Sequence, residues 1–166
     1  MPFSLPVPVD NFPVVTPHQA CLMADRLDPT LKDPASFRHW TPVLIRFRDL
    51  DLLAHVNNVN LAGWLEDGRV ALELPIQPLT TDYRGPVIVL VDAHIQYLDE
   101  TRLGDEVKIG TRIQRIGGTS VVIGQAVFAS GRCVAIAEFV EVLVGNESRK
   151  PEPWPPEFRA LFEQWQ

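Results

Sequence analysis

Residues 47–58, FRDLDLLAHVNN, hold the densest group of side chains that could do chemistry. Asp51 has a carboxylate that can attack a carbonyl carbon or take a proton from water. His55 can act as a base at neutral pH, since its ordinary pKa is about 6.5. Asn57 and Asn58 favour the start of a helix, where free backbone N–H groups can hold developing negative charge.

The same residues also have ordinary structural explanations. Aspartate is common between a strand and a helix because it caps and turns the chain. For Asp51 we favour the chemical interpretation, because a helix and a β meander follow in register. For His55 two interpretations stay open: a general base, or a ring that packs under the loop and fixes the start of the helix.

The elements that must position these residues are predicted from periodicity. Residues 43–48 (VLIRFR) predict a strand, and residues 60–74 predict an amphipathic helix that Pro75 ends. One side of this helix is apolar, and we expect the opposite side to be solvated. The apolar side holds Leu61, Trp64, Leu65, Gly68, Ala71 and Leu72, and the solvated side holds Glu66, Arg69 and Glu73. A Glu66–Arg69 pair is the ordinary expectation at this spacing.

Four long β segments rich in Val and Ile follow, at residues 87–98, 106–116, 119–130 and 133–144. Short turns separate them and predict an antiparallel meander. The last segment is apolar on both faces apart from Glu138 and Glu141, which predicts a central or covered strand. Strands of about eleven residues span ~36 Å, whereas the helix covers only ~22 Å. We therefore predict an α+β fold in which one long sheet curls around one helix.

Composition and charge restrict the function further. The 166 residues are 46% apolar and 22% charged, as in one globular domain. The net charge is −6 with scattered Lys and Arg, which argues against a nucleic-acid partner. Apolar runs are too short to span a membrane and there is no signal peptide pattern, so we expect a cytoplasmic protein. Cys21 and Cys133 lie far apart without clustered histidines, which predicts reduced cysteines and no metal.

We divide the chain into three parts. Residues 1–42 are rich in proline and predict an extended arm without a regular core element, apart from a short helix around residues 18–26. Residues 43–153 form the main domain. Residues 154–166 end in a short helix that begins near Pro156.

The motif pattern resembles the hotdog-fold acyl-CoA thioesterases of the 4-hydroxybenzoyl-CoA thioesterase type, in the branch with DxDxxxHVNN. The matching stretch runs from about residue 43 to residue 153. Its matching residues are Asp49-Leu50-Asp51, His55-Val56-Asn57-Asn58, Trp64-Leu65-Glu66 with Arg69, Tyr97, Gly104-Asp105-Glu106-Val107, and Ile116-Gly117 with Ser120. Two departures are Leu53, where related plant thioesterases often have Asn, and Asp99-Glu100, where many relatives have proline.

The resemblance implies catalytic roles near the helix tip. The N–H of Asn58 would hold the thioester oxygen, and Asp51 would attack the carbonyl or activate water. We expect the N–H groups of Asn58, Val59 and Asn60 to be free, with Asn57 beside them. Glu66 is a second candidate base, because some hotdog branches use a helix carboxylate.

The resemblance also implies a substrate site without a metal or cofactor. Arg115, Thr119 and Ser120 would lie near the pantetheine and phosphates of CoA. Tyr97, Trp40 and Trp64 either line an acyl tunnel or fill the core. On the strand 87–98, Asp92, His94 and Gln96 share a face that we expect to be wet or to line an interface.

We expect a homodimer or a dimer of dimers, because a single curled sheet leaves an edge strand unprotected. In the resembled family each acyl site is shared between subunits. The function that fits best is hydrolysis of an acyl-CoA to a carboxylate and CoA. The alternatives are a non-catalytic acyl-CoA binder or regulator, for which Leu53 leaves room, and a thioesterase acting on acyl-ACP, which an acidic surface favours less.

Overall fold

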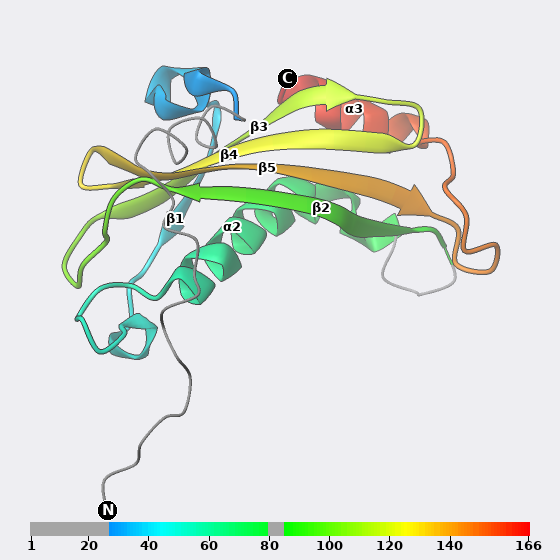
Figure 1. Cartoon of the computed structure of the whole chain (residues 1–166). Helices are drawn as coiled ribbons and strands as arrows, with labels where there is room; N and C mark the ends of the chain where they lie inside the picture. Colours follow the sequence, from blue (N-terminus) through cyan, green and yellow to red (C-terminus); the bar gives the residue numbers. More distant parts are fainter. Residues whose placement is uncertain (1–26, 80–84) are drawn as a thin grey trace, which may run out of the picture.

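The structure, a computed structural model, describes residues 27–79 and 85–166. One five-stranded sheet arches over a long helix, α2 (Asn58–Glu73), and a shorter helix, α3 (Pro156–Gln164), packs near one end of the sheet (Figure 1). We call the face toward α2 the inner face. The predicted sheet curled around one helix is therefore present. In the described part of the chain, no helix has the length and apolar character that crossing a membrane requires.

All neighbouring strands are antiparallel, in the order β1-β3-β4-β5-β2. Strands β3, β4 and β5 form the expected meander, and β5 is internal as predicted. The strands are β1 (His39–Val43), β2 (Val87–Tyr97), β3 (Val107–Ile116), β4 (Ser120–Ala129) and β5 (Arg132–Val144). The described residues also contain four 3-10 helices, at Pro29–Lys32, Pro34–Ser36, Phe47–Asp49 and Leu74–Leu79.

The predicted pairing of β2 with β3 is wrong, because β2 pairs with β5. The connection after β2 crosses to the other side of the sheet instead of turning back. On its way it meets the loop that precedes α2, where the Val56 N–H donates to the Thr101 carbonyl at 2.8 Å and His55 forms a bridge with Arg102. This crossing leaves β2 as an edge strand.

The first strand also differs from the prediction. It spans His39–Val43 rather than residues 43–48, so the N-terminal part does contain a regular element. Pro42 is tolerated because β1 is an edge strand, where a missing N–H need not break a ladder. The chain then turns at Phe47–Asp49, where the Asp49 carboxylate accepts from the Arg46 N–H at 2.7 Å. The predicted helix around residues 18–26 lies outside the described residues.

The core lies between α2 and the inner face. Leu61, Trp64, Leu65 and Leu72 are buried there, as the periodicity predicted, and Trp64 is a core residue. Gly68 faces the sheet so closely that an added Cβ would lie 2.9 Å from Ile109 Cγ2. The helix therefore rests directly on β3.

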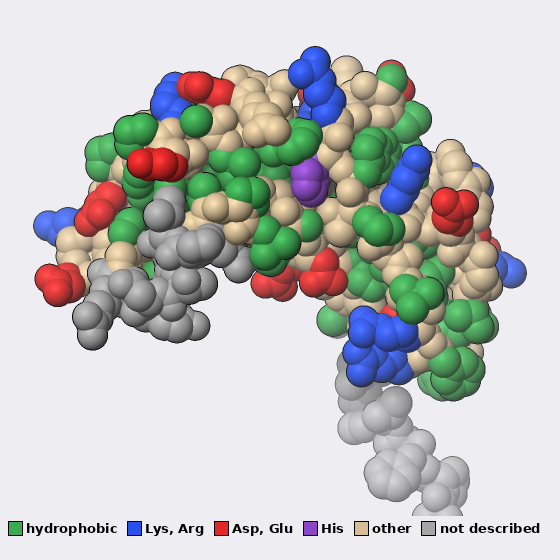
Figure 2. Space-filling view, turned by 180° about the vertical axis from the view of Figure 1, so that it is seen from behind, with side chains coloured by type: hydrophobic (Ala, Val, Ile, Leu, Met, Phe, Trp, Pro, Cys, Tyr) green, Lys and Arg blue, Asp and Glu red, His purple; other side chains and the backbone are tan. Residues whose placement is uncertain are grey.

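The outer face is partly covered by the segment before β1. Leu31 and Phe37 are buried against Phe128, and Trp40 packs beside Phe128 with ring centroids 5.6 Å apart. We call the group formed by Leu31, Phe37, Trp40 and Phe128 the outer cluster; it lies on the opposite face from α2. At one end of the inner face, α3 buries Phe158 and Phe162. Figure 2 shows one face of the molecule, on which Lys and Arg side chains stand in small groups among acidic and apolar ones.

Candidate functional site

The loop before α2 folds back on itself as a narrow hairpin. The Asp51 N–H donates to the His55 carbonyl at 2.8 Å, Leu50 bridges Val56, and the Asn57 N–H donates to the Asp49 carbonyl at 2.9 Å. Asp51 and His55 therefore stand at the turn of the hairpin. The other end leads directly into α2.

The Asp51 carboxylate has one engaged oxygen and one free oxygen. Its Oδ1 accepts from the backbone N–H groups of Leu53 at 2.8 Å and His55 at 3.2 Å. Its Oδ2 receives no hydrogen bond from the described residues. The side chain is half-buried and lines a pocket of about 400 Å³ with Phe47, Leu50, Leu52 and Ala54. Asp51 therefore both shapes the loop and keeps an oxygen available for chemistry.

The tip of α2 has fewer free amides than expected. Asn57 caps the helix, because its Oδ1 accepts from the Val59 N–H at 2.9 Å and its carbonyl accepts from the Asn60 N–H at 2.9 Å. The expectation of free donors at Val59 and Asn60 is therefore wrong. The Asn58 N–H has no acceptor among the described residues, so it is the remaining donor at the tip.

Tyr97 lies beside this tip, although it is far away in the sequence. Its hydroxyl donates to the Asn58 carbonyl at 3.2 Å. This contact joins the end of β2 to the beginning of α2. It brings together three residues predicted for the site: Asn57, Asn58 and Tyr97.

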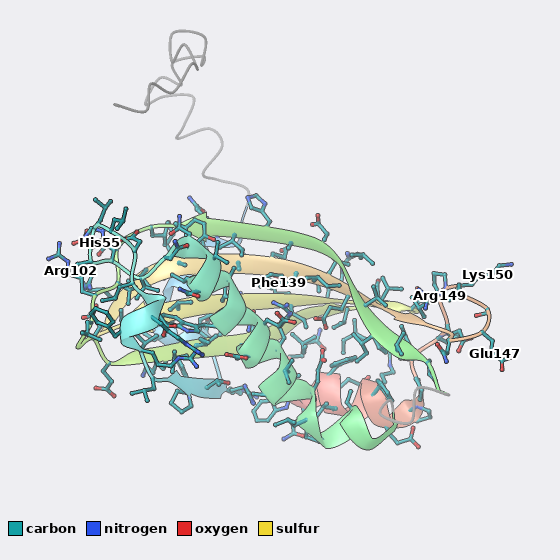
Figure 3. The ribbon with its side chains drawn as sticks, turned by 90° about the horizontal axis from the view of Figure 1, so that it is seen from below. His55, Arg102, Phe139, Glu147, Arg149 and Lys150 are labelled. Atoms are coloured by element: carbon teal, nitrogen blue, oxygen red, sulfur yellow. The ribbon has the colours of Figure 1, made fainter. Side chains whose placement is uncertain are left out.

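His55 is engaged in a separate polar group at the same end of the molecule. Its Nε2 lies 2.9 Å from Glu100 Oε2, and Glu100 also pairs with Arg102. Figure 3 shows His55 and Arg102 together at this end. The ring thus holds the hairpin to the segment after β2, which is the structural interpretation of His55. The asparagine that Leu53 replaces would stand on an exposed part of the same turn.

Arg115, Thr119 and Ser120 lie at the opposite end of the sheet. Ser120 of β4 pairs with Val142 of β5, whereas Tyr97 of β2 pairs with Ala135 of β5. Seven strand positions separate Val142 from Ala135, which is roughly 23 Å. A single chain therefore does not bring these three residues to Asp51 and Asn58.

Glu66 is exposed on α2, but the pair expected with Arg69 does not form. Arg69 is buried, and its Nε lies 3.0 Å from Glu141 Oε1 on β5. Glu73 is buried beside them. The prediction that Arg69 and Glu73 lie on a solvated face is thus wrong, because α2 turns this face toward β5.

This buried group is the feature that sequence reasoning missed. Burial raises the pKa of Glu73 to about 10, and hydrogen bonding to the neighbouring Glu141 carboxylate, together with its charge, acts in the same direction. A signal was present in the sequence, since Glu141 is one of two acids in a strand that is otherwise apolar on both faces, and a buried acid needs a partner. The partner, Arg69, is visible only once the helix is placed against the strand.

No group of three or more His, Cys, Asp or Glu side chains suited to a metal occurs among residues 27–79 and 85–166. On β2, Asp92 and His94 do not belong to such a group. Cys133 is half-buried and packs against the outer cluster, and burial raises the pKa of its thiol.

Comparison with known proteins places this architecture in a family. A family model described as the thioesterase-like superfamily matches residues 45–162. The chain belongs to the thioesterase-like superfamily. The matched range contains both the Asp51 hairpin and α2.

Individual relatives agree with membership of the thioesterase-like superfamily. A protein of Bacillus subtilis (strain 168), YneP, whose name provisionally calls it an acyl-CoA thioesterase, is 27% identical over 124 residues, which is 73% of this chain and 87% of YneP. A thioesterase from Thermus thermophilus, solved with coenzyme A and Zn, is 31% identical with a TM-score of 0.68, over 78% of this chain and 95% of that one.

The PA5185 protein of Pseudomonas aeruginosa strain PAO1 is 25% identical with a TM-score of 0.72, over 80% of this chain and 94% of that one. These likenesses confirm the hotdog fold.

Proposed function

We propose that this chain hydrolyses acyl-CoA thioesters to a carboxylate and free CoA. The observation that carries the proposal is that one short segment holds two polar groups without a hydrogen-bond partner among the described residues. The Asn58 N–H at the helix tip has no acceptor among the described residues, and the Asp51 carboxylate in the adjoining hairpin keeps Oδ2 free. The coenzyme A bound to the related Thermus thermophilus thioesterase supports the choice of substrate.

In the proposed reaction, the Asn58 N–H donates to the thioester oxygen and stabilises the negative charge that develops there. Asp51 takes a proton from water while the water oxygen bonds to the carbonyl carbon, or it attacks that carbon itself through Oδ2. The C–S bond then breaks, and the CoA sulfur leaves and takes up a proton. On the direct route, a second step with water releases the carboxylate from Asp51.

Asp51→Asn tests this role with little disturbance of the loop. The Asn side chain retains an oxygen that can accept from the Leu53 and His55 N–H groups, but it cannot act as a base or as a carboxylate nucleophile. We expect kcat to fall by about 100-fold or more, with an unchanged unfolding temperature. Thiol release from an acyl-CoA panel with short, long and aryl groups measures the rate.

Asp67→Asn is the matched control, because Asp67 is an exposed carboxylate on α2 outside the site. It should leave kcat unchanged. Full activity in Asp51→Asn would remove Asp51 from the mechanism. The same assay with acyl-ACP in place of acyl-CoA tests whether the protein acts on a thioester of CoA or of acyl carrier protein.

A non-catalytic acyl-CoA binder is the second candidate. It is favoured by the use of Asp51 Oδ1 to hold the hairpin, because this is a structural task that needs no chemistry. Calorimetry distinguishes the two functions. A binder retains acyl-CoA tightly without releasing thiol, whereas a hydrolase releases thiol from the bound ligand.

The proposed active site also involves a second copy of the chain. The side chains predicted to contact CoA, Arg115, Thr119 and Ser120, are about one sheet length from the Asp51 hairpin of their own chain. Among the described residues, no strand pairs with the outer edge of β2. If two copies pair antiparallel along β2, the Ser120 end of one copy meets the Asn58 end of the other. The CoA contacts predicted for these three residues would then come from the second copy.

A further inference from the structure

A charged cluster lies between α2 and β5, well away from the Asp51 hairpin. Arg69, Glu73 and Glu141 are only 5%, 9% and 5% exposed. Arg69 Nε lies 3.0 Å from Glu141 Oε1, and the guanidinium carbon lies 4.0 Å from the centroid of the Phe139 ring. We call these three charged residues the inner cluster.

The inner cluster is neutral overall but incompletely paired. The raised pKa of Glu73 keeps that carboxyl protonated at neutral pH, so the charges of Arg69 and Glu141 balance. Among the described residues, Glu73 Oε1 and Glu141 Oε2 have no N–H or hydroxyl partner, and the protonated Glu73 carboxyl is hydrogen-bonded to the Glu141 carboxylate. Arg69 Nη1 also lacks an acceptor in this part of the chain. Arg69 Nη1 can therefore donate a further hydrogen bond, and the carboxyl oxygens keep lone pairs that can accept one.

Stability alone does not explain such a group. A buried ion pair is often no more stabilising than apolar residues of similar size, and an orphaned buried donor is costly. The inner cluster also borders a pocket of about 210 Å³, whose remaining wall is mainly apolar: Val70, Ile88 and Leu90, with Glu66 at its edge. Charged and apolar side chains thus line the pocket together, which suits a ligand that is itself partly polar.

Helix α2 and strand β2 both extend from the proposed thioester site to this pocket. Tyr97 at the end of β2 contacts Asn58, while Ile88 and Leu90 near its beginning line the pocket with Glu73. Strand β2 therefore runs antiparallel to α2, and Figure 3 shows Phe139 on the inner face between them. The helix rise puts Glu66 roughly 12 Å and Glu73 roughly 22 Å from Asn58.

We propose that the acyl group lies between α2 and β2 and that the inner cluster binds an uncharged polar group, a hydroxyl or an amide, near the far end of the acyl chain. This inference rests on the proposed thioesterase function and deepens it by naming the substrate class. The preferred substrates are acyl-CoAs with a terminal or near-terminal hydroxyl or amide, rather than plain saturated ones.

The chemistry of the inner cluster decides against a charged end group. A carboxylate would lie against Glu141, and an ammonium would lie against Arg69, so either one would add an unbalanced charge to a buried site. A hydroxyl can accept from Arg69 and donate to a carboxylate oxygen at the same time. It would satisfy groups that a plain methyl end leaves unpaired.

The test is a series of acyl-CoAs of increasing length, each unsubstituted, hydroxylated next to the thioester, or hydroxylated at the far end. At the length that reaches the inner cluster, the far-end hydroxyl should raise kcat/KM by about tenfold or more over the unsubstituted chain. The hydroxyl next to the thioester is the positional control and should not raise kcat/KM. Equal kcat/KM values for all three forms at every length would overturn the proposal.

Two substitutions at Glu73 identify the residue responsible. Glu73→Gln keeps a neutral hydrogen-bonding end and should retain the preference, whereas Glu73→Leu should bring the ratio of kcat/KM values for the hydroxylated and the plain chain close to one. Asp67→Leu, on an exposed part of the same helix, is the matched control. Thermal unfolding identifies variants that have lost their fold. An unchanged preference in a folded Glu73→Leu variant would also overturn the proposal.

Binding separates this inference from the proposed function. Calorimetry with thioether analogues, which cannot be hydrolysed, measures the same preference as a ratio of Kd values. A preference in binding without any turnover would reject the hydrolase and keep the inference. Turnover without a preference in either measurement would reject the inference alone.

Discussion

Two aspartates two positions apart show how strongly the surroundings decide the role of a residue. Asp49 is buried, and its carboxylate accepts a hydrogen bond from the Arg46 N–H at 2.7 Å. Asp51 is half-buried at the turn of the hairpin, and one of its oxygens receives no hydrogen bond from the described residues. The side chains are chemically identical, but only Asp51 can meet a substrate.

Glu73 provides a test at the residue scale. Its raised pKa means that the carboxyl is protonated in the folded chain and ionised in the unfolded chain between about pH 4.5 and about pH 10. The unfolded state binds fewer protons there, so this group makes the protein less stable as the pH rises. Glu73→Gln removes that loss, and its unfolding temperature should increasingly exceed that of the wild type from about pH 5 to about pH 9.

Thermal unfolding at several pH values measures this difference. Asp67→Asn serves as the control, because its carboxylate is exposed and its substitution should change the unfolding temperature equally at each pH. A constant difference between Glu73→Gln and the wild type would show that Glu73 is ionised in the folded protein.

At the scale of elements, α2 must rest closely on the sheet to present its tip to the hairpin. Gly68 makes this approach possible, since a Cβ there would lie 2.7 Å from Gln125 Nε2 and 2.9 Å from Ile109 Cγ2. Gln125 is buried and donates to Thr111 Oγ1 at 2.8 Å. Gly63, five residues earlier, has no described atom within 4 Å of the same position apart from its chain neighbours and its own helix backbone.

The two glycines therefore predict opposite responses to alanine. Gly63→Ala gains helix propensity and should stabilise the protein by up to about 1 kcal/mol. Gly68→Ala gains the same propensity but crowds Ile109 and Gln125, at a cost of roughly 1–3 kcal/mol, so we expect net destabilisation. Urea unfolding measures both variants, and equal stabilisation by both would contradict the close contact of α2 with β3.

At the scale of the whole molecule, the long strand β2 forms one edge of the sheet. In the described part of the chain it is flanked by β5 on one side only, and Leu90 and Val91 are exposed large apolar residues on it. Edge strands of this kind are open to pairing with another chain. Pairing of two copies along β2 would also bring Arg115, Thr119 and Ser120 of the second copy to the proposed active site.

Val91→Lys tests the proposed dimer. A lysine on an edge strand opposes pairing, and in a symmetric dimer two of them would be brought close together. We expect sedimentation to show a dimer for the wild type and a monomer for Val91→Lys, with loss of thioesterase activity. Leu74→Lys is the control, because Leu74 is 55% exposed and Val91 57% exposed. A monomeric wild type would reject the shared site.

The sequence by itself determined α2 and the four long strands, but not the position of β1. Helix α2 and strands β2 to β5 lie within two residues of their predicted bounds, because hydrophobic periodicity is a local property of the chain. The Asn cap at the tip of α2 was predictable for the same reason.

Only the tertiary structure decided how distant segments meet. It placed β2 beside β5, left the Asn58 N–H as the remaining donor at the tip, and buried Arg69 and Glu73 against Glu141. Each of these depends on which strand crosses the sheet and which side of α2 faces it. From the sequence alone, charged residues are predicted to be exposed to solvent. Their burial is tolerated only when a partner from a distant segment neutralises them.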